Sequence, residues 1–442
     1  MSPEYRSLPV DATSAARLAD DGLRLATVDT ADPLAFTAWL AAESRGFHEV
    51  HPGAAGMAGR VRVLGDRRTT GVWDDTIAEP AAPVATVSSW PAPLTLPGRT
   101  DVPAWAISAV TVSPTHRRRG IARALLESEL RTAAALGIPV AMLTVSEATI
   151  YSRYGFAPSA PAADWTIDTR RARWTGPTAD GRVHFVSLET MRDEGPALLE
   201  RIRLEEPGHI GFDGHLWERL VGLGGDEPDA AKKLRAVRYD DGAGAAQGFA
   251  VYSLTADPGD FANHTLDVKY LASATDDAYA ALWRFLLEMD LVATVRASLR
   301  SPDEAVHWQV SDIRGVTRRA SDHLWTRILD VPLALEARRY PAPGRLVLQV
   351  TDPLGFAEGR FVLETAADGS ARVTQPDGRA DAAAGLPGLA LSAGELAALY
   401  LGGTSAMTLL KAGRLAELAP GSAAAADSLF RSSIHPWLSI WF

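Results

Sequence analysis

The sequence predicts a mixed α/β protein with several domains. Residues 110–156 read in order as a β-branched strand, a turn, an amphipathic helix, a second strand and a helical turn. Between about 183 and 315, strand and helix patterns alternate in the same way, and from about 322 the pattern changes to an α+β type. A chain of 442 residues has room for about two to four such domains.

The first 110 residues are predicted from their apolar spacing. Met1–Asp20 has scattered acidic residues and no apolar run, which predicts a solvated arm and argues against a signal peptide. Pro33–Glu43 has apolar residues near a helical spacing, which predicts a first helix. Short apolar runs predict strands at Val61–Leu64, paired across a charged turn with Thr69–Trp73, and at Val84–Trp90 and Trp105–Val112.

The later elements follow from the same rules. Apolar residues at spacings of three and four predict a helix over Ala122–Ala133, which Gly137 and Pro139 end. The further predicted strands are Val140–Val145, Val183–Leu188, Gly248–Thr255, Leu266–Ala272, Leu346–Val350 and Arg360–Glu364. The further predicted helices are Glu194–Arg203, Asp276–Met289, Ser392–Tyr400 and Ser405–Lys411.

Composition excludes several classes of function. The net charge is -10, from 44 basic and 54 acidic residues, so general nucleic-acid binding is not expected, whereas cationic substrates suit the charge. There are no cysteines, which excludes disulfides, thiolate metal sites and a cysteine nucleophile. No run reaches the length of a membrane span, and we expect a soluble cytoplasmic protein.

The segment V-T-V-S-P-T-H-R-R-R-G-I-A-R carries the strongest local signal. A strand stops at Pro114, three arginines lead to Gly120, and a helix follows. Glycine permits close approach of the backbone, and the first N–H groups of a helix attract anions. The order Arg117-x-x-Gly120-x-Ala122 matches the phosphate turn of GCN5-related N-acetyltransferases, so the sequence predicts a site for the pyrophosphate of acetyl-coenzyme A.

With the second motif, S-E-A-T-I-Y-S-R-Y-G-F, the chain resembles the Eis (enhanced intracellular survival) family of acetyltransferases. The segment L-W-T-R-I-L-D-V-P at 324–332 and the terminal Trp441-Phe442 carry the resemblance to the end of the chain. The resemblance implies two tandem GNAT-like domains followed by a sterol-carrier-protein-like α+β domain. We place these at residues 1–165, 166–318 and 319–442, with the phosphate turn absent from the second.

The resemblance also implies which residues hold acetyl-coenzyme A and which do chemistry. The matching cofactor positions are Val110, Thr111, Val112, Arg118, Arg119, Gly120, Ile121, Ala122, Arg123, Ser146 and Glu147. Tyr151 matches the general acid, and Phe442 matches the residue whose free carboxylate is the general base. Tyr154 competes for the acid role, but Tyr151 holds the matching place.

Both roles also make chemical sense without the resemblance. A protonated amine needs a base before it attacks a thioester, and a departing thiolate benefits from a proton donor. Residues 434–442 are so apolar that we expect them to be docked, which would fix the terminal carboxylate in space. A purely structural plug is the alternative for this segment.

The acceptor is predicted only by class. The resemblance implies amines of aminoglycosides, polyamine-like molecules or lysine side chains, and it also implies a homo-oligomer, a hexamer. Glu49 is a candidate receptor for a cationic amine, with Phe47 and Trp39 as apolar walls. His48 and His51 beside Glu49 are more typical of solvated or substrate-contacting groups than of metal ligands, so no metal is predicted. The alternatives are a lipid or sterol carrier with relic acetyltransferase domains, and an acyltransferase for longer acyl groups.

Overall fold

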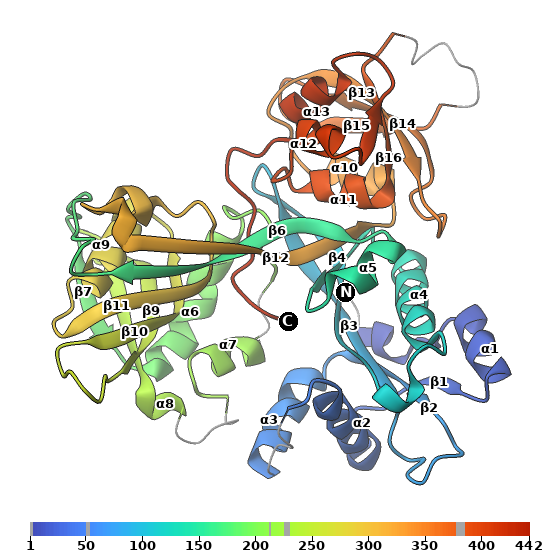
Figure 1. The fold of residues 1–442 in the computed structure, drawn as a ribbon, viewed down its shortest axis with the longest axis horizontal. Coiled ribbons are helices and arrows are strands. Elements are labelled where there is room, and N and C mark those ends of the chain that lie inside the picture. Colours follow the sequence, from blue (N-terminus) through green and yellow to red (C-terminus); the bar gives the residue numbers. More distant parts are fainter. Residues whose placement is uncertain (1–2, 50–53, 212–213, 225–229, 377–384) are drawn as a thin grey trace. The chain divides into compact units, whose positions relative to one another are not determined.

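The computed structural model describes residues 3–49, 54–211, 214–224, 230–376 and 385–442, which form two compact units. The first unit contains Met1–Ser159, Leu324–Ser433 and Phe442, and the second contains Ala160–His323 and Ile434–Trp441. The chain leaves the first unit within strand β6 (Ala157–Asp168) and returns within strand β12 (Val316–Ile328) (Figure 1). The two α/β parts and the α+β part that the sequence predicts therefore fall into two structural units.

The large sheet of the first unit has the strand order β1-β2-β3-β4-β5-β12. Neighbours are antiparallel except β4 and β5, which are parallel and are joined by helix α4. The strands are β1 (Arg24–Thr27), β2 (Arg68–Trp73), β3 (Ala85–Leu96), β4 (Thr100–Val112) and β5 (Val140–Thr144). The helices are α1 (Ala12–Asp20), α2 (Pro33–Gly46), α3 (Ala54–Leu64), α4 (Ile121–Ala135) and α5 (Ala148–Tyr151), with short 3-10 turns η1 (Pro3–Ser7), η2 (Pro114–His116) and η3 (Ser152–Tyr154).

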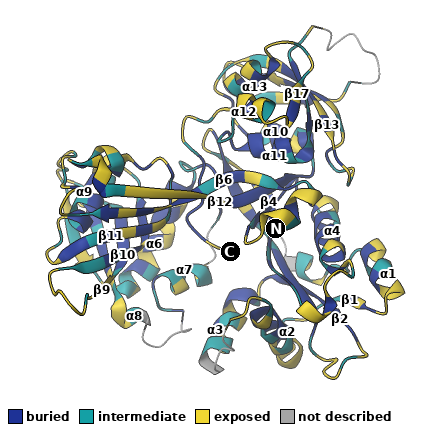
Figure 2. Ribbon diagram, viewed as in Figure 1, coloured by how far each residue is buried: buried dark blue, intermediate teal, exposed yellow. Residues whose placement is uncertain are grey.

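Strand alternation divides the apolar side chains of this sheet between two layers. Val72 packs in the cluster that contains Leu125 of α4, whereas the next residue, Trp73, packs in the cluster that contains Trp39 of α2. Successive side chains of a strand point to opposite faces, so α4 and α2 cover opposite faces of the sheet. Figure 2 shows that the buried residues concentrate in the strands.

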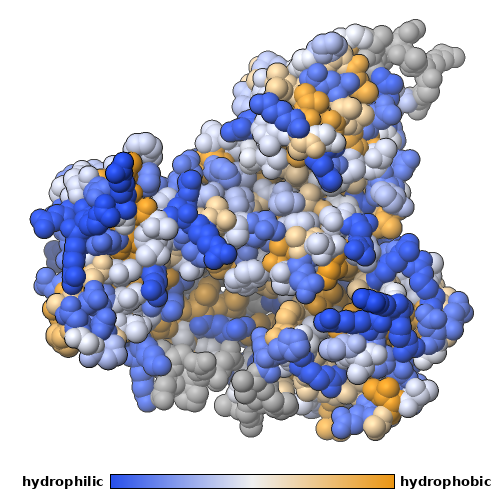
Figure 3. All heavy atoms as spheres, in the orientation of Figure 1, coloured by the Kyte–Doolittle hydropathy of each residue, from blue (hydrophilic) through white to orange (hydrophobic). Residues whose placement is uncertain are grey.

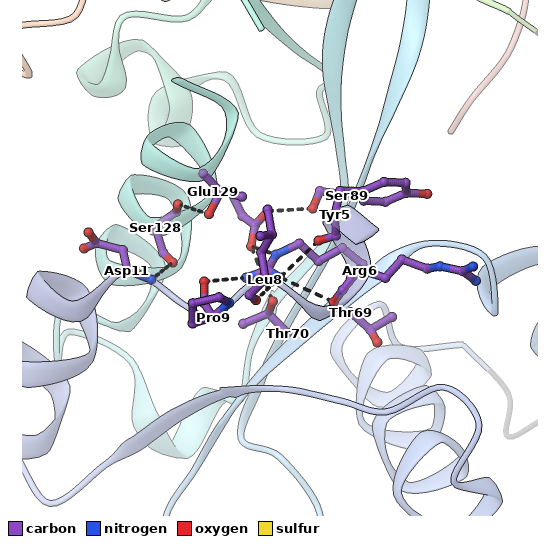
Figure 4. Close-up of polar contacts among 12 residues, drawn as sticks. Tyr5, Arg6, Leu8, Pro9, Asp11, Thr69, Thr70, Ser89, Ser128 and Glu129 are labelled. Atoms are coloured by element: carbon purple, nitrogen blue, oxygen red, sulfur yellow. Dashed lines mark hydrogen bonds and ion pairs between the residues drawn. The ribbon is translucent and has the colours of Figure 1, made fainter. Parts of the chain in front are cut away.

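The N-terminal segment is folded onto the sheet, so the prediction of a solvated arm was wrong. Residues 12–20 form α1, whose Leu18 is fully buried, and the ring of Tyr5 packs edge-on against Trp105. The buried guanidinium of Arg68 donates hydrogen bonds to the carbonyl oxygens of four residues in this segment, Tyr5, Arg6, Leu8 and Pro9 (Figure 4). Composition reveals exposed charge but not a distant arginine that satisfies main-chain carbonyls.

Arg68 has its counter-ion in Glu129 of α4, and both side chains are inaccessible to solvent. The Nε of Arg68 lies 3.5 Å from Oε1 of Glu129. Glu129 also accepts hydrogen bonds from Ser89 Oγ at 2.5 Å (Figure 4) and from the indole Nε1 of Trp105 at 3.2 Å. A buried charge is tolerated when it is paired and its hydrogen bonds are satisfied, and this pair ties β2, α4 and the N-terminal segment together.

The predicted strand at Val61–Leu64 was also wrong, because these residues form the end of helix α3. Val63 and Leu64 are buried in the cluster that contains Phe36 of α2, so they face one side of a helix. Arg60 reinforces this packing, since it pairs with Glu43 of α2 and with Glu49. A run of four residues with two valines fits either structure by periodicity alone.

The C-terminal part of the first unit is a separate α+β layer. Its sheet has the order β15-β14-β13-β16-β17, with β13 and β16 parallel and the other neighbours antiparallel. The strands are β13 (Gly344–Thr351), β14 (Gly359–Thr365), β15 (Ala371–Thr374), β16 (Gly388–Ser392) and β17 (Leu415–Glu417). The helices are α10 (Val331–Ala337), α11 (Ala393–Tyr400), α12 (Ala406–Lys411) and α13 (Ser422–Phe430). The prediction of α11 is confirmed, and Ser392 and Glu395 form a capping box at its start.

The second unit repeats the strand–helix–strand pattern of the first. Its strands follow the order β6-β11-β10-β9-β8-β7, and the parallel pair β10 and β11 is joined by helix α9. The strands are β7 (Arg182–Val186), β8 (Leu234–Asp240), β9 (Ala246–Thr255), β10 (His264–Ser273) and β11 (Val292–Arg300). The helices are α6 (Leu188–Arg203), α7 (Gly214–Leu220), α8 (Ala230–Lys233) and α9 (Asp276–Leu287), with short turns η4 (Ala305–Trp308) and η5 (Ile313–Gly315).

Hydrophilic side chains cover much of the face shown in Figure 3. Within the described ranges, no helix combines the length and the apolarity that a membrane crossing requires.

The buried Arg68–Glu129 pair gives a test of this core. Glu129→Gln keeps the size of the side chain but leaves Arg68 without its counter-ion. Breaking a buried pair costs about 3–5 kcal/mol, so we expect a clear fall in the melting temperature. The exposed Glu79→Gln is the control, and equal melting temperatures for the two variants would contradict a structural role for the pair.

Candidate active site

The site begins where β4 and β5 separate. Their parallel pairing runs from Ala104 and Val140 to Ala106 and Met142, yet β4 continues to Val112 and β5 to Thr144. A register shift against β3 and a positive φ of 53° at Ala109 mark a bulge in β4 at this point. In the described chain, main-chain groups of β4 beyond Ala106 therefore have no partner on β5. Val110, Thr111 and Val112 lie on this stretch, and the buried Thr111 hydroxyl is 2.7 Å from that of Thr86.

The predicted phosphate turn has the backbone of an anion site. Arg118 and Gly120 both have positive φ, 65° and 72°, and Gly120 is the N-cap residue of α4. No side chain caps this helix start, and a Cβ at Gly120 would meet nothing within 4 Å. The N–H groups of Ile121, Ala122 and Arg123 therefore start a 15-residue helix without a side-chain acceptor. These features suit a polyphosphate.

The arginines of the turn have different environments. Arg119 donates to the main-chain oxygen of Asp21 at 2.8 Å and to Asp74 at 3.4 Å, and Arg123 donates to Glu127 at 2.6 Å. The exposed side chains of Arg117 and Arg118 contact no partner among the described residues. Arg117 and Arg118 are thus the guanidinium groups of the turn that need no protein contact broken before they bind an anion.

Sequence reasoning missed the group that holds this turn. His116 is buried, with its Nε2 3.2 Å from Asp74 and its Nδ1 2.8 Å from the Thr115 hydroxyl. Hydrogen bonds from Thr76, together with those from His116 and Arg119, hold the pKa of Asp74 well below its usual range. The histidine in T-H-R-R-R-G and the aspartates after Trp73 were the visible signal, but they lie about 40 residues apart and no local pattern joins them.

Tyr151 lies at the end of α5, which follows β5 closely. Ser146 and Glu147 are exposed, and Glu147 is the N-cap residue of α5. The ring of Tyr151 is 6% exposed and packs edge-on against Phe156. Burial, and then the charge of Glu147, raises the pKa of Tyr151 to about 12. None of the described residues hydrogen-bonds its hydroxyl. Because its pKa is raised, the phenol stays protonated at neutral pH and can donate a proton.

Tyr154 is also buried in the same apolar cluster. Its pKa is raised, again chiefly by burial. Both tyrosines are therefore neutral at physiological pH, and chemistry alone does not choose between them.

Phe442 lies beside the end of β5. The hydroxyl of Thr144 donates a hydrogen bond to a main-chain oxygen of Phe442 at 3.1 Å. The Phe442 ring packs edge-on against Trp90 of β3, with the ring centres 5.6 Å apart. The guanidinium carbon of Arg67 also lies over the Trp90 ring, 3.6 Å from its centre. Phe442 is therefore held by residues of the first unit, and one of them, Thr144, lies two positions before Ser146.

The preceding residues are docked in the second unit. The indole Nε1 of Trp437 donates to Glu206 at 2.7 Å, its backbone N–H donates to the carbonyl of Pro207, and its ring packs on Arg300. The hydroxyls of Ser439 and Tyr270 lie 3.2 Å apart, and His323 Nε2 lies 2.7 Å from the carbonyl oxygen of Ile440. Residues 437–440 are thus held by side chains, as the apolar composition of this segment predicts.

The candidate acceptor residues differ in burial and in their contacts. Trp39 is fully buried, and its Nε1 donates to the carbonyl of Thr70, which is the environment of a core residue. Phe47 is 43% exposed at the end of α2. Glu49 is exposed but pairs with Arg60 at 2.6 Å. Arg60 would have to release Glu49 before this carboxylate received an amine.

His51 lies outside the described residues, so the possible His48 and His51 pair has no geometry here. In the described part of the chain, no group of three histidine or acidic side chains is arranged to hold a metal ion.

Comparisons with known proteins now identify the fold and its chemistry. Residues 27–159 and 208–328 each match an acetyltransferase (GNAT) domain, and residues 331–439 match a sterol carrier protein domain. The chain is 33% identical to the N-acetyltransferase Eis of Mycobacterium tuberculosis over 330 residues, which cover 73% of this chain and 76% of that protein. The chain belongs to the Eis family of N-acetyltransferases.

A relative aligned over more of the chain and a solved structure agree with this assignment. An N-acetyltransferase of Streptomyces avermitilis described as uncharacterized is 38% identical over 423 residues, covering 93% of this chain and 96% of that protein. The crystal structure of Eis1 from Mycobacterium abscessus has a TM-score of 0.77 and 27% identity, covering 95% of this chain and 99% of that chain. The predicted fold, two GNAT domains followed by a sterol-carrier-like domain, is confirmed. This Eis-family protein is an acetyltransferase.

The cluster that holds Trp437 predicts a pH-dependent stability. Burial, and then Arg300 and Arg203, lowers the pKa of His209 to about 3, against about 6.5 in an unfolded chain. The unfolded state therefore binds more protons below pH 6.5, and stability falls as the pH drops from 6.5 toward 3.

His209→Gln should flatten this dependence, as measured by melting temperature between pH 4 and 8. Glu206 faces the same cluster with a raised pKa, which acts in the opposite direction, but it is present in both proteins and cancels in the comparison. Parallel curves for the two proteins would exclude His209 as the titrating group.

Proposed function

We propose that this Eis-family protein transfers an acetyl group from acetyl-coenzyme A directly to the amine of a cationic small molecule or a lysine side chain. In this proposal Tyr151 is the general acid and the α-carboxylate of Phe442 is the general base. The observation that carries it is the hydrogen bond from Thr144 to Phe442. It brings the carboxylate to the strand end from which the chain continues into α5 and Tyr151.

The residues of the β4–α4 turn fit the donor. The open backbone around Gly120, the uncapped start of α4 and the free guanidinium groups of Arg117 and Arg118 would hold the pyrophosphate. The main-chain groups of Val110, Thr111 and Val112 that face away from β3 would pair with the amides of the pantetheine arm. Ser146 and Glu147, which follow the end of β5, would also contact the cofactor. Bound there, acetyl-coenzyme A supplies a thioester whose sulfur is a good leaving group.

The carboxylate of Phe442 prepares the nucleophile. An amine with a pKa near 10 is mostly protonated at neutral pH, so the carboxylate must accept a proton from the ammonium group before the nitrogen attacks. The Phe442 ring packs against Trp90, and a carboxylate that such apolar groups partly desolvate becomes a stronger base. Thr144 fixes its orientation.

Tyr151 assists the departure of sulfur. As the amine nitrogen bonds to the acetyl carbon and the carbon–sulfur bond breaks, the Tyr151 hydroxyl gives its proton to the sulfur. The nitrogen gives up two protons in all, the sulfur gains one, and one is released to water. Transfer is direct because the chain has no cysteine to carry the acetyl group.

The acceptor class follows from charge and from the relatives. A net charge of -10 attracts polycationic amines, and the relatives are named N-acetyltransferases. Aminoglycosides, polyamine-like molecules and lysine side chains all offer such amines. We propose that residues 1–165 perform the reaction, that 166–318 form a second GNAT-like domain, and that 319–442 supply the carboxylate.

Tyr151→Phe tests the acid. Removal of the hydroxyl should lower kcat by about 10²–10⁴-fold, the usual contribution of a positioned acid, while the KM for acetyl-coenzyme A changes little. Thiol release with an aminoglycoside acceptor is the measurement. Tyr154→Phe is the matched control and should retain most of the turnover. If the losses are reversed, Tyr154 is the acid.

Thr144→Val tests the base through its hydrogen bond. The bond stabilises the charged carboxylate, so its loss should raise the pKa of the base. A hydrogen bond of about 1 kcal/mol corresponds to a shift of about 0.7 unit, and the acid limb of the kcat–pH profile should move upward by that amount. Thr149→Val, exposed on α5, is the control. An unmoved limb would contradict this assignment.

Residues appended after Phe442 would convert its carboxylate into an amide, and kcat should then collapse. Proteolytic removal of the extension should restore turnover. Full activity in the extended protein would exclude Phe442 as the base.

A further inference from the structure

The segment L-W-T-R-I-L-D-V-P contains a buried arginine that the reaction scheme does not use. Arg327 of β12 is fully buried. Its Nε donates a hydrogen bond to the carbonyl oxygen of Tyr154 at 2.7 Å, and its Nη2 donates to Asp352 at 2.6 Å. Tyr154 ends the turn that directly follows Tyr151. Arg327 thus connects the backbone next to Tyr151 with a carboxylate from the sterol-carrier-like domain.

Gly155 has the conformation and the space that this contact requires. Its φ is +82°, and a Cβ added to it would lie 2.6 Å from Nε of Arg327. The glycine in I-Y-S-R-Y-G-F therefore permits both a left-handed turn end and the close approach of the guanidinium. This contact accounts for Gly155 in the first motif and for Arg327 in the second. The two hydrogen-bonded residues, Tyr154 and Arg327, are 173 positions apart in the sequence.

Asp352 is built to receive this arginine. It starts the loop between β13 and β14, and it accepts hydrogen bonds from the backbone N–H groups of Ala357 at 2.8 Å and Leu354 at 3.1 Å. Burial alone would raise its pKa, but Arg327 and these N–H groups keep the pKa below its usual value. The carboxylate is therefore ionised, and two N–H groups of its own loop bind it.

The same loop also packs against the core of the first GNAT domain. Leu354 and Phe356 contact the apolar cluster that contains Tyr151, Tyr154 and Phe156. The guanidinium carbon of Arg327 lies 5.6 Å from the centre of the Phe356 ring. The loop therefore packs against the same apolar core that contains Tyr151.

We infer that Arg327 and Asp352 are positioning residues for Tyr151, through which the loop between β13 and β14 of the sterol-carrier-like domain fixes the acid for proton transfer. This inference rests on the proposed acid role of Tyr151. The carbonyl of Tyr154 ends a turn and is buried, so without Arg327 it would lose its partner and the turn would rearrange. The third domain thereby acts on the site through a loop as well as through Phe442.

Arg327→Lys is the principal test. Lysine keeps the charge opposite Asp352 but cannot bond Asp352 and the Tyr154 carbonyl with the geometry of a planar guanidinium. A displacement of about 1 Å at a catalytic group lowers the rate by about 100-fold, so we expect kcat to fall by about 10- to 100-fold with the KM for acetyl-coenzyme A unchanged. Asp352→Asn is the second variant and should show a smaller loss of the same kind.

The pH profile separates positioning from folding. A loosened Tyr151 admits water, which reduces the desolvation that raises its pKa. The alkaline limb of kcat should therefore move down toward pH 10 in Arg327→Lys. Arg338→Lys is the matched control, because Arg338 is equally buried and its hydrogen bonds within the described residues go to the carbonyls of Tyr400 and Phe430 in the third domain. It should lower the melting temperature without moving the limb.

A double variant distinguishes failure of the inference from failure of the proposed function. In a Tyr151→Phe background, Arg327→Lys should reduce kcat little further, since both changes remove the same proton transfer. Losses that multiply, or an Arg327→Lys profile identical to that of Arg338→Lys, would overturn the positioning role. If Tyr151→Phe itself keeps full turnover, the acid assignment fails instead.

Discussion

The early end of pairing between β4 and β5 is the constraint on which the site depends. A strand in a sheet normally uses its main-chain groups on its neighbours, but β4 has no partner on β5 beyond Ala106. The opening is stable because β5 is held on its other edge by β12 along its full length, from Val140 opposite Ile328 to Thr144 opposite Leu324. β5 can therefore leave β4 and still present Thr144 to Phe442. The strand that holds β5 in place is also the strand that carries Arg327.

Three fully buried arginines perform one physical task in different places. Arg68, Arg327 and Arg338 each donate to main-chain carbonyl oxygens that no regular secondary structure satisfies: those of the N-terminal segment, of the turn after Tyr151, and of the ends of α11 and α13. A guanidinium has five donors in a fixed plane, so it can satisfy several carbonyls at once where an ammonium group cannot. In Arg338 the negative ends of two helix dipoles face the charge, which offsets the cost of its burial.

The sequence predicted the parts of the fold and the site that depend on local patterns. The turn before α4 could be predicted because a strand, a glycine and an amphipathic helix are adjacent in the chain, and Gly120 has the left-handed backbone that this pattern requires. The N-terminal helix and α3 were missed because short or charged segments fit more than one structure. Contacts such as Arg327 with Tyr154, or Asp74 with His116, join residues far apart in sequence. Neither partner has an unusual local pattern, so only the fold reveals them.

The second GNAT domain has the same strand–helix–strand unit without the features of the proposed anion site. β10, α9 and β11 repeat the strand–helix–strand unit, but the start of α9 is capped by a side chain. The Thr275 hydroxyl accepts a hydrogen bond from the Ala278 N–H, and Asp276 and Asp277 occupy the first turn. These carboxylates stabilise the helix by facing its positive end, and for the same reason they repel a phosphate.

Beyond the last paired residues of β10 and β11, Arg300 donates to the carbonyl of Leu271 and packs on Trp437. In this domain, therefore, the separated strands are bridged by a side chain and covered by the chain's own C-terminal segment. The same supersecondary unit therefore contacts the chain's own C-terminal segment here, and its helix start has neither the glycine nor the exposed arginines of the turn before α4.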